Sequence, residues 1–119
     1  MVGSGTRNAR AATPGDTDWA RIASLYDRLA ARAPSPVVEL NRAVAVAMAS
    51  GPAAGLAIVD ALVASGALDG YHLLPSVRGD LLAKLGRTTE ARQEFERAAT
   101  MTRNARERDL FEARAAALR

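Results

Sequence analysis

The side chains that most often carry chemistry are scarce in this sequence of 119 residues. It has no cysteine and a single histidine, His72. This excludes disulfides, thiolate zinc sites, cysteine nucleophiles and any metal site built from several histidines. His72 titrates nearest to neutral pH, but no serine or aspartate accompanies it at the spacing of a catalytic triad. We therefore expect a structural or exposed histidine, and no catalytic residue, cofactor or metal.

Asn41 is the polar residue whose position is most informative, and two interpretations of it stay open. It falls on the apolar side of a predicted helix. A buried amide must find hydrogen-bond partners, so it could bond to a neighbouring loop or helix. Alternatively, it lies on the concave face of a helical stack and contacts a peptide. That face would carry Val38, Asn41, Ala45 and Met48, followed by Leu73, Ser76, Asp80 and Lys84.

The charged residues favour surface ion pairs over a nucleic-acid site. The net charge is only +3, although the cations are 15 arginines and one lysine, Lys84. Glu90, Glu94 and Glu96 interleave with Arg87 and the arginines that follow, as in helix-surface ion pairs. A nucleic-acid-binding protein concentrates its cations on one face. With no phosphate-binding glycine-rich loop either, we expect a protein that is not an enzyme and makes no direct contact with nucleic acid.

The composition predicts the elements that must position these residues. There are 27 alanines and 13 leucines, the residue types that lead the helix-propensity scale, so we predict an all-α protein. The length suggests one domain, with residues 1–15 as a flexible leader and 16–119 as the helical part. No apolar run is long enough for a membrane span and no signal-peptide pattern is present, so the expected compartment is the cytoplasm, without membrane contact.

Capping residues predict six helices, over 17–32, 36–50, 52–65, 74–85 and 88–102 and from Asn104 onward. Asp16 or Thr17 would cap the first helix, and Ser35 would cap the second. Pro75 places the start of the fourth helix near Leu74. Asn104 and Glu107 have the spacing of a capping box. The predicted buried faces are Trp19, Ile22, Tyr26 and Leu29 in the first helix, Val37, Leu40, Val44, Ala47 and Met48 in the second, and Phe111, Arg114, Ala115 and Leu118 in the last.

Two turn glycines indicate an internal repeat. Gly51 and Gly86 lie 35 residues apart, one more than the tetratricopeptide period. In the second unit, Gly79 and Leu82 fit the small and large positions of the first helix, and Ala91, Phe95 and Ala98 fit those of its partner. In the first unit, Val44 would take the small position and Leu56 the first position of the second helix. We predict a right-handed tetratricopeptide-like stack of antiparallel hairpins; the alternative is a plain bundle with glycine turns.

Three long segments carry a resemblance to a known family. They are TDWARIASLYDRL (17–29), PSPVVELNRAVAVAMASGPAAGLA (34–57) and GYHLLPSVRGDLLAKLGRTTEAR (70–92). Together they resemble the C-terminal tetratricopeptide-like extension of extracytoplasmic-function (ECF) type bacterial sigma factors. The resemblance covers about residues 16–119. In that family, promoter binding lies in two upstream domains, which this chain lacks.

The resemblance implies a cytoplasmic interaction module without catalysis. Its implied partners are the sigma core domains or RNA polymerase, and the oligomeric state is left open. The residues expected to contact a partner are Val38, Asn41, Arg42, Met48, Tyr71, His72, Asp80 and Lys84. The alternative function is a ligand-sensing or oligomerising helical domain outside transcription.

Overall fold

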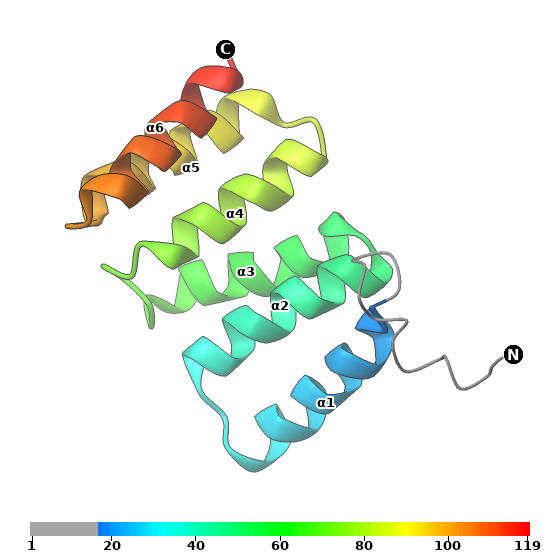
Figure 1. Cartoon of the computed structure of the whole chain (residues 1–119). Helices are drawn as coiled ribbons and strands as arrows, with labels where there is room; N and C mark the ends of the chain where they lie inside the picture. Colours follow the sequence, from blue (N-terminus) through cyan, green and yellow to red (C-terminus); the bar gives the residue numbers. More distant parts are fainter. Residues whose placement is uncertain (1–16) are drawn as a thin grey trace, which may run out of the picture.

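The computed structural model describes residues 17–119, which form six α-helices and no strand (Figure 1). The helices are α1 (Trp19–Arg32), α2 (Pro36–Ser50), α3 (Pro52–Ser65), α4 (Leu73–Lys84), α5 (Thr88–Met101) and α6 (Ala105–Ala117). Each helix packs mainly against the helices next to it in the chain. This confirms the prediction of an all-α stack of about six helices. The predicted leader, residues 1–15, lies outside the described residues.

The first two helices begin at side-chain caps. The Ser35 hydroxyl accepts a hydrogen bond from the backbone N–H of Val38, and Pro36 follows at the first helical position, where its missing N–H costs nothing. Asp18, and not Asp16 or Thr17, caps α1 by accepting from the N–H of Arg21 at 3.0 Å. The structured part of α1 therefore begins two residues later than predicted.

The starts of α4 and α6 also follow the local sequence. Leu73 begins α4 one residue before the predicted start, which still leaves Pro75 in the first turn. Asn104 accepts from the N–H of Glu107 at 3.0 Å, as the capping box requires. The Glu107 carboxylate, however, accepts from the Thr102 hydroxyl at 2.7 Å. That same hydroxyl accepts from the Asn104 N–H, so Thr102 replaces the return bond of the box.

Two apolar clusters form the core of the stack. The larger lies among α2, α3 and α4 and includes Val59 and Leu82, which are fully buried. The smaller lies between α5 and α6 around Phe95 and Phe111. Leu118 packs against both clusters and so joins them.

Small residues bring paired helices together at two places. A Cβ added to Gly55 of α3 would lie 2.6 Å from the carbonyl oxygen of Ala43 and 2.6 Å from the Cβ of Ala47. A Cβ added to Gly79 of α4 would lie 3.1 Å from the Phe95 ring. Both glycines therefore mark close approaches within a helical hairpin, and a methyl group at Gly55 would meet the more severe overlap.

The two close approaches lie at a spacing of 36 residues. Ala43 and Gly79 are 36 residues apart, and so are their partners Gly55 and Ala91, which lie on α3 and α5. The predicted register, with Val44 and Leu56 at its matching positions, lies one residue later than these contacts. The predicted register rested on the 35-residue spacing of the turn glycines Gly51 and Gly86. Turn glycines do not report the helix spacing well here, because the turn between α2 and α3 is shorter than the turn between α4 and α5.

The predicted buried faces of α1 and α2 are only partly buried. In α1 the one buried residue is Ala23, and Leu29 is 43% exposed, because α1 packs substantially on α2 alone. In α2, Leu40 and Ala47 are buried as predicted. The larger Val37, Val44 and Met48 are exposed, because α2 turns its alanines toward its neighbours. The second helix therefore leaves an apolar stripe open.

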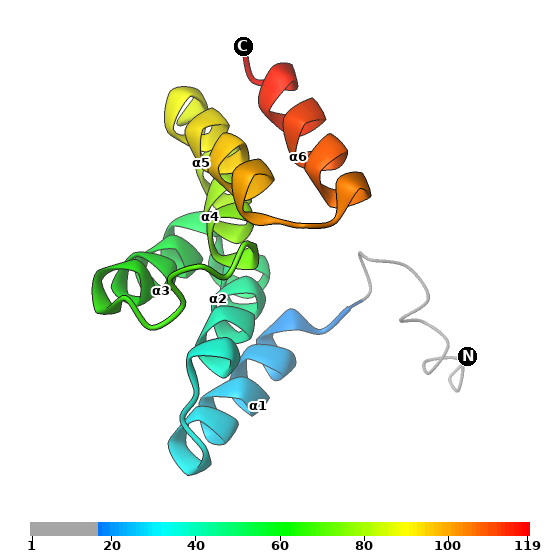
Figure 2. The same cartoon turned by 90° about the vertical axis from the view of Figure 1, so that its left-hand side faces the viewer.

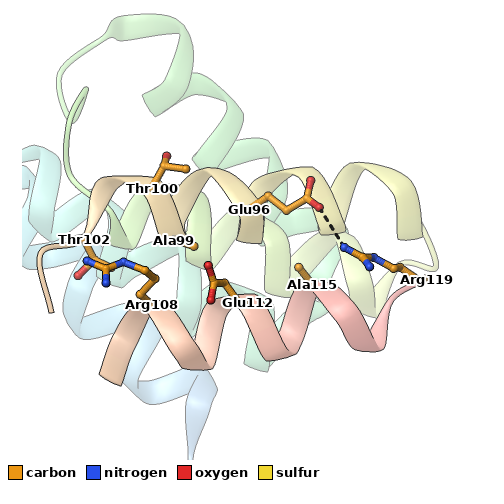
Figure 3. Close-up of a pocket in the computed structure, with 8 residues that line it drawn as sticks. All are labelled: Glu96, Ala99, Thr100, Thr102, Arg108, Glu112, Ala115 and Arg119. Carbon is orange, nitrogen blue, oxygen red and sulfur yellow. Dashed lines mark ion pairs between the residues drawn. The ribbon is translucent and has the colours of Figure 1, made fainter. Parts of the chain in front are cut away.

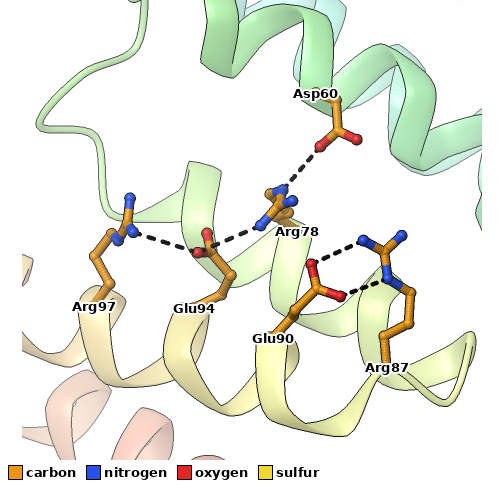
Figure 4. Close-up of polar contacts among 6 residues, drawn as sticks. All are labelled: Asp60, Arg78, Arg87, Glu90, Glu94 and Arg97. Carbon is orange, nitrogen blue, oxygen red and sulfur yellow. Dashed lines mark hydrogen bonds and ion pairs between the residues drawn. The ribbon is translucent and has the colours of Figure 1, made fainter.

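Ion pairs link three consecutive helices (Figure 4). Arg78 of α4 donates to Asp60 of α3 at 2.8 Å and lies 3.5 Å from the buried carboxylate of Glu94 on α5. Arg87, which immediately precedes α5, makes two hydrogen bonds of 2.8 Å to Glu90. The interleaved charges of this region thus form surface ion pairs, as predicted, and one of them reaches into the core.

Candidate interaction groove

The described helices leave one face of α2 and α4 open. Figure 2 shows α3 on one side of α2 and α4, and α1 and α6 on the other. The open face holds a hollow of about 260 Å³, which we call the concave groove. Its lining comes from α2, α4 and α6 and consists of Val44, Ala47, Met48, Ser76, Val77, Asp80, Leu81, Lys84, Phe111 and Arg114. Most of these residues are apolar, and the charged ones lie on α4 and α6.

On α4, the predicted concave face agrees well with the groove. Ser76, Asp80 and Lys84 line it, and Leu73, one turn earlier, is exposed. The Ser76 hydroxyl donates to the carbonyl oxygen of Leu73 at 2.9 Å, so it is satisfied within its own helix. The polar residues that remain available on α4 are therefore Asp80 and Lys84.

On α2, only part of the predicted face lies at the groove. Met48 lines it. Asn41 is exposed and lies on the same stripe, since residues 41, 44 and 48 share one face of a helix. The interpretation of Asn41 as a buried amide is therefore wrong. Ala45 is also misassigned, because it is 1% exposed and so cannot contact a partner.

Val38, Arg42 and Ala45 share another face of α2, which packs toward α1. Arg42 lies 3.1 Å from Asp27 of α1 and donates two hydrogen bonds to Glu39 on its own helix. The two hydrogen bonds to Glu39, followed by the single one to Asp27, raise the pKa of Arg42 above its ordinary value although burial opposes this. The structure thus gives Arg42 a place in the interface between α1 and α2.

Three charged side chains meet at the rim of the concave groove. Asp80 accepts from Arg114 of α6 at 2.9 Å and lies 3.1 Å from the Lys84 ammonium. Burial raises the pKa of the Asp80 carboxyl, but the hydrogen bonds from Arg114 and Lys84 together outweigh it, so the pKa lies below its ordinary value. The rim therefore holds two cations against one ionised carboxylate.

A second hollow lies next to Arg114, among residues of α4, α5 and the C-terminal end of α6. This alanine hollow of about 300 Å³ is lined by Ala83, Phe95, Ala113, Arg114, Ala117 and Leu118. The Arg114 guanidinium carbon lies 4.4 Å from the centre of the Phe95 ring, a cation–π contact that fixes the side chain. Arg114 is thus shared by the two hollows. Sequence analysis placed it only on the inner face of the last helix, since nothing in the sequence relates it to Asp80, 34 residues earlier.

Tyr71 and His72 lie outside the groove lining. Both are partly buried, and Tyr71 packs against the larger core cluster. The His72 ring lies 6.1 Å from the Phe111 ring. Its Nε2 is 3.2 Å from the Glu107 carboxylate, without the alignment of a hydrogen bond. These residues hold the start of α4 against the start of α6.

A larger hollow of about 600 Å³ lies between α5 and α6 (Figure 3). Its rim mixes both signs of charge, with Arg119 3.9 Å from Glu96. Two small residues, Ala99 and Ala115, contribute to its lining. No pattern in the sequence indicates this hollow, because alanines on paired helices are equally typical of a closed interface.

Other kinds of site can be assessed over residues 17–119. In that range no three histidine or acidic side chains are grouped as metal ligands would be. None of the helices there combines the length and the apolar character that crossing a bilayer requires.

The fold and the groove define a class of architecture, a helical stack with one open face, and comparison with known proteins adds one relative. An uncharacterized protein of Rhizobium meliloti (strain 1021) is 49% identical over 100 residues, which cover 84% of this chain. The chain spans only 23% of the length of that relative. No family model matches the chain, and no solved structure matches it.

Proposed function

We propose that this chain is a non-catalytic protein-interaction module of an ECF-type sigma factor. In this proposal a right-handed tetratricopeptide-like stack binds the sigma core domains or RNA polymerase in the cytoplasm, without contacting nucleic acid or a membrane. The observation that carries it is the concave groove, which combines an apolar lining with a charged rim. Such a surface suits a peptide segment or a helix of a partner protein.

The segments that resemble the sigma-factor extension also build the groove. Residues 34–57 contain α2, which contributes Val44 and Met48, and residues 70–92 contain α4, which contributes Asp80 and Lys84. The bacterial relative is much longer than the aligned region. This length supports a role for the aligned region as one module of a larger protein.

Calorimetric titration of the chain with a two-domain sigma core tests the proposal. We expect saturable binding, because the groove offers apolar surface that gains from leaving water. Asn41→Ala should weaken binding while leaving the melting temperature unchanged, since Asn41 is exposed beside the groove. Gln93→Ala is the matched control, because it shortens an exposed amide side chain on α5 that does not line the groove.

A flat titration with a chain shown to be folded would overturn the proposal. It would favour the alternative of a ligand-sensing or oligomerising helical domain. Sedimentation over a wide concentration range would then show whether the exposed apolar residues of α1 and α2 mediate self-association.

A further inference from the structure

We propose that the concave groove binds an acidic segment in which a carboxylate lies beside a large apolar side chain. In this proposal Asp80 forms ion pairs with Lys84 and Arg114 in the free protein. A carboxylate of the partner replaces Asp80 in these ion pairs on binding. The inference rests on the proposed function only in treating the groove as the interaction site.

The net charge at the rim of the groove determines which charge a partner should carry. Lys84 of α4 and Arg114 of α6 converge on opposite oxygens of Asp80, at 3.1 Å and 2.9 Å. Among residues 17–119, no other carboxylate forms an ion pair with either cation. Both cations remain nearly half exposed, at 49% and 43% of their side chains. The groove therefore carries one excess positive charge, which favours an anionic partner.

The cations keep the capacity to bind a further carboxylate. A lysine ammonium has three donors and an arginine guanidinium has five, and Asp80 engages only a part of them. Ion pairs as exposed as these contribute little to stability, so exchanging Asp80 for a carboxylate of a partner costs little. Arg114 stays in position during such an exchange, because the Phe95 ring supports its guanidinium.

The two hollows that Arg114 lines determine which side chains can lie next to the carboxylate of the partner. One is the apolar part of the groove around Val44 and Phe111, and the other is the alanine hollow around Ala83 and Ala117. The alanine hollow is about 300 Å³ and lined almost entirely by apolar residues. A large apolar side chain placed there gains from leaving water. The pattern on α4 and α6 thus fits an acidic residue adjacent to a leucine or phenylalanine.

The test uses a fluorescein-labelled synthetic peptide with adjacent glutamate and leucine residues, and a counterpart with glutamine in place of glutamate. Fluorescence anisotropy measures the binding of each peptide to the full chain. We expect the glutamate peptide to bind about tenfold more tightly than its counterpart, with the difference shrinking at high salt. Asp80→Asn should strengthen binding of the glutamate peptide several-fold, because it frees both cations.

Two further variants keep the test decisive. Lys84→Glu, at an exposed position, should abolish the preference for the glutamate peptide. Asp60→Asn removes another exposed partner of an arginine, Arg78, outside the groove, and should leave binding unchanged. Equal binding of the two peptides, or binding that Asp80→Asn fails to strengthen in a folded chain, would overturn the inference.

The outcome is separable from that of the proposed function. If the sigma core binds but the glutamate peptide shows no preference, the proposed function stands and this inference fails. If the peptide binds as expected but the sigma core does not, the groove chemistry stands and the sigma-factor role fails.

Discussion

At the scale of single residues, Asp80 is the most constrained side chain of the candidate site. Its carboxylate lies between Lys84 of its own helix and Arg114 of α6. The ion pair with Arg114 joins α4 to α6, which are distant in the chain, so this pair forms only when the stack is folded. Asp80 therefore makes a small contribution to the stability of the stack, of about 1 kcal/mol or less, and this contribution depends on its charge.

This connection gives the chain a predicted pH dependence. Burial opposes ionisation, but the hydrogen bonds from Arg114 and Lys84 prevail and lower the pKa of Asp80 in the folded state. A lowered pKa stabilises the fold above the unfolded pKa of about 3.9, and this contribution is lost as the pH falls through the folded pKa. We expect the free energy of unfolding to fall as the pH drops below the unfolded pKa of about 3.9, and to fall less in Asp80→Asn. Urea denaturation at a series of pH values measures this free energy for both proteins. An equal fall in the wild type and in Asp80→Asn would contradict the prediction.

At the scale of the helices, contact between small residues sets how closely each hairpin closes. A Cβ at Gly55 would lie 2.6 Å from backbone and Cβ atoms of α2, whereas one at Gly79 would lie 3.1 Å from the edge of the Phe95 ring and 3.3 Å from the Ala91 carbonyl oxygen. A side chain can shift slightly, but a helix backbone can move only with its whole helix. The two glycines therefore differ in how much a methyl group would cost.

We expect Gly55→Ala to destabilise the chain by about 1–3 kcal/mol, as overpacking does. Gly79→Ala should stay within about 1 kcal/mol of the wild type, because the helix-propensity gain of alanine offsets a milder contact. Thermal and urea denaturation of the two variants measure the difference. Equal destabilisation would show that the two hairpins close with the same tightness.

At the scale of the whole molecule, the chain is a stack in which contacts are local. α4 packs against α3, α5 and α2, whereas α1 packs on α2 and α6 on α5. In such stacks, stability is approximately the sum of contributions from neighbouring units. The terminal helices therefore receive less support than the middle ones.

Hydrogen exchange measured by mass spectrometry should reveal this gradient. We expect the amides of α1 to exchange fastest among the six helices, because its larger apolar residues stay partly exposed. The amides of α4 should exchange slowest, near the rate set by global unfolding. Uniform protection across all six helices would indicate a single cooperative unit instead.

The sequence by itself determined the helices and most of their ends. Ser35, Pro36 and Asn104 act within one turn of the chain, so their effect could be read without knowing any distant neighbour. The same holds for Gly51, which ends α2 in a conformation that only glycine adopts readily, with φ of 103°. The all-α class followed from composition for the same reason, since helix propensity is a local property.

The tertiary structure alone decided which face of each helix is covered. Val44 and Met48 fit the apolar periodicity of a buried stripe, yet they are exposed because no described helix covers that side of α2. Asn41 is exposed on that same side, whereas Ala45, on another face of α2, is buried. The meeting of Asp80 with Arg114 likewise depends on how α6 packs over α5. Periodicity shows that a helix has an apolar side, but only the neighbouring helices determine how much of that side is buried.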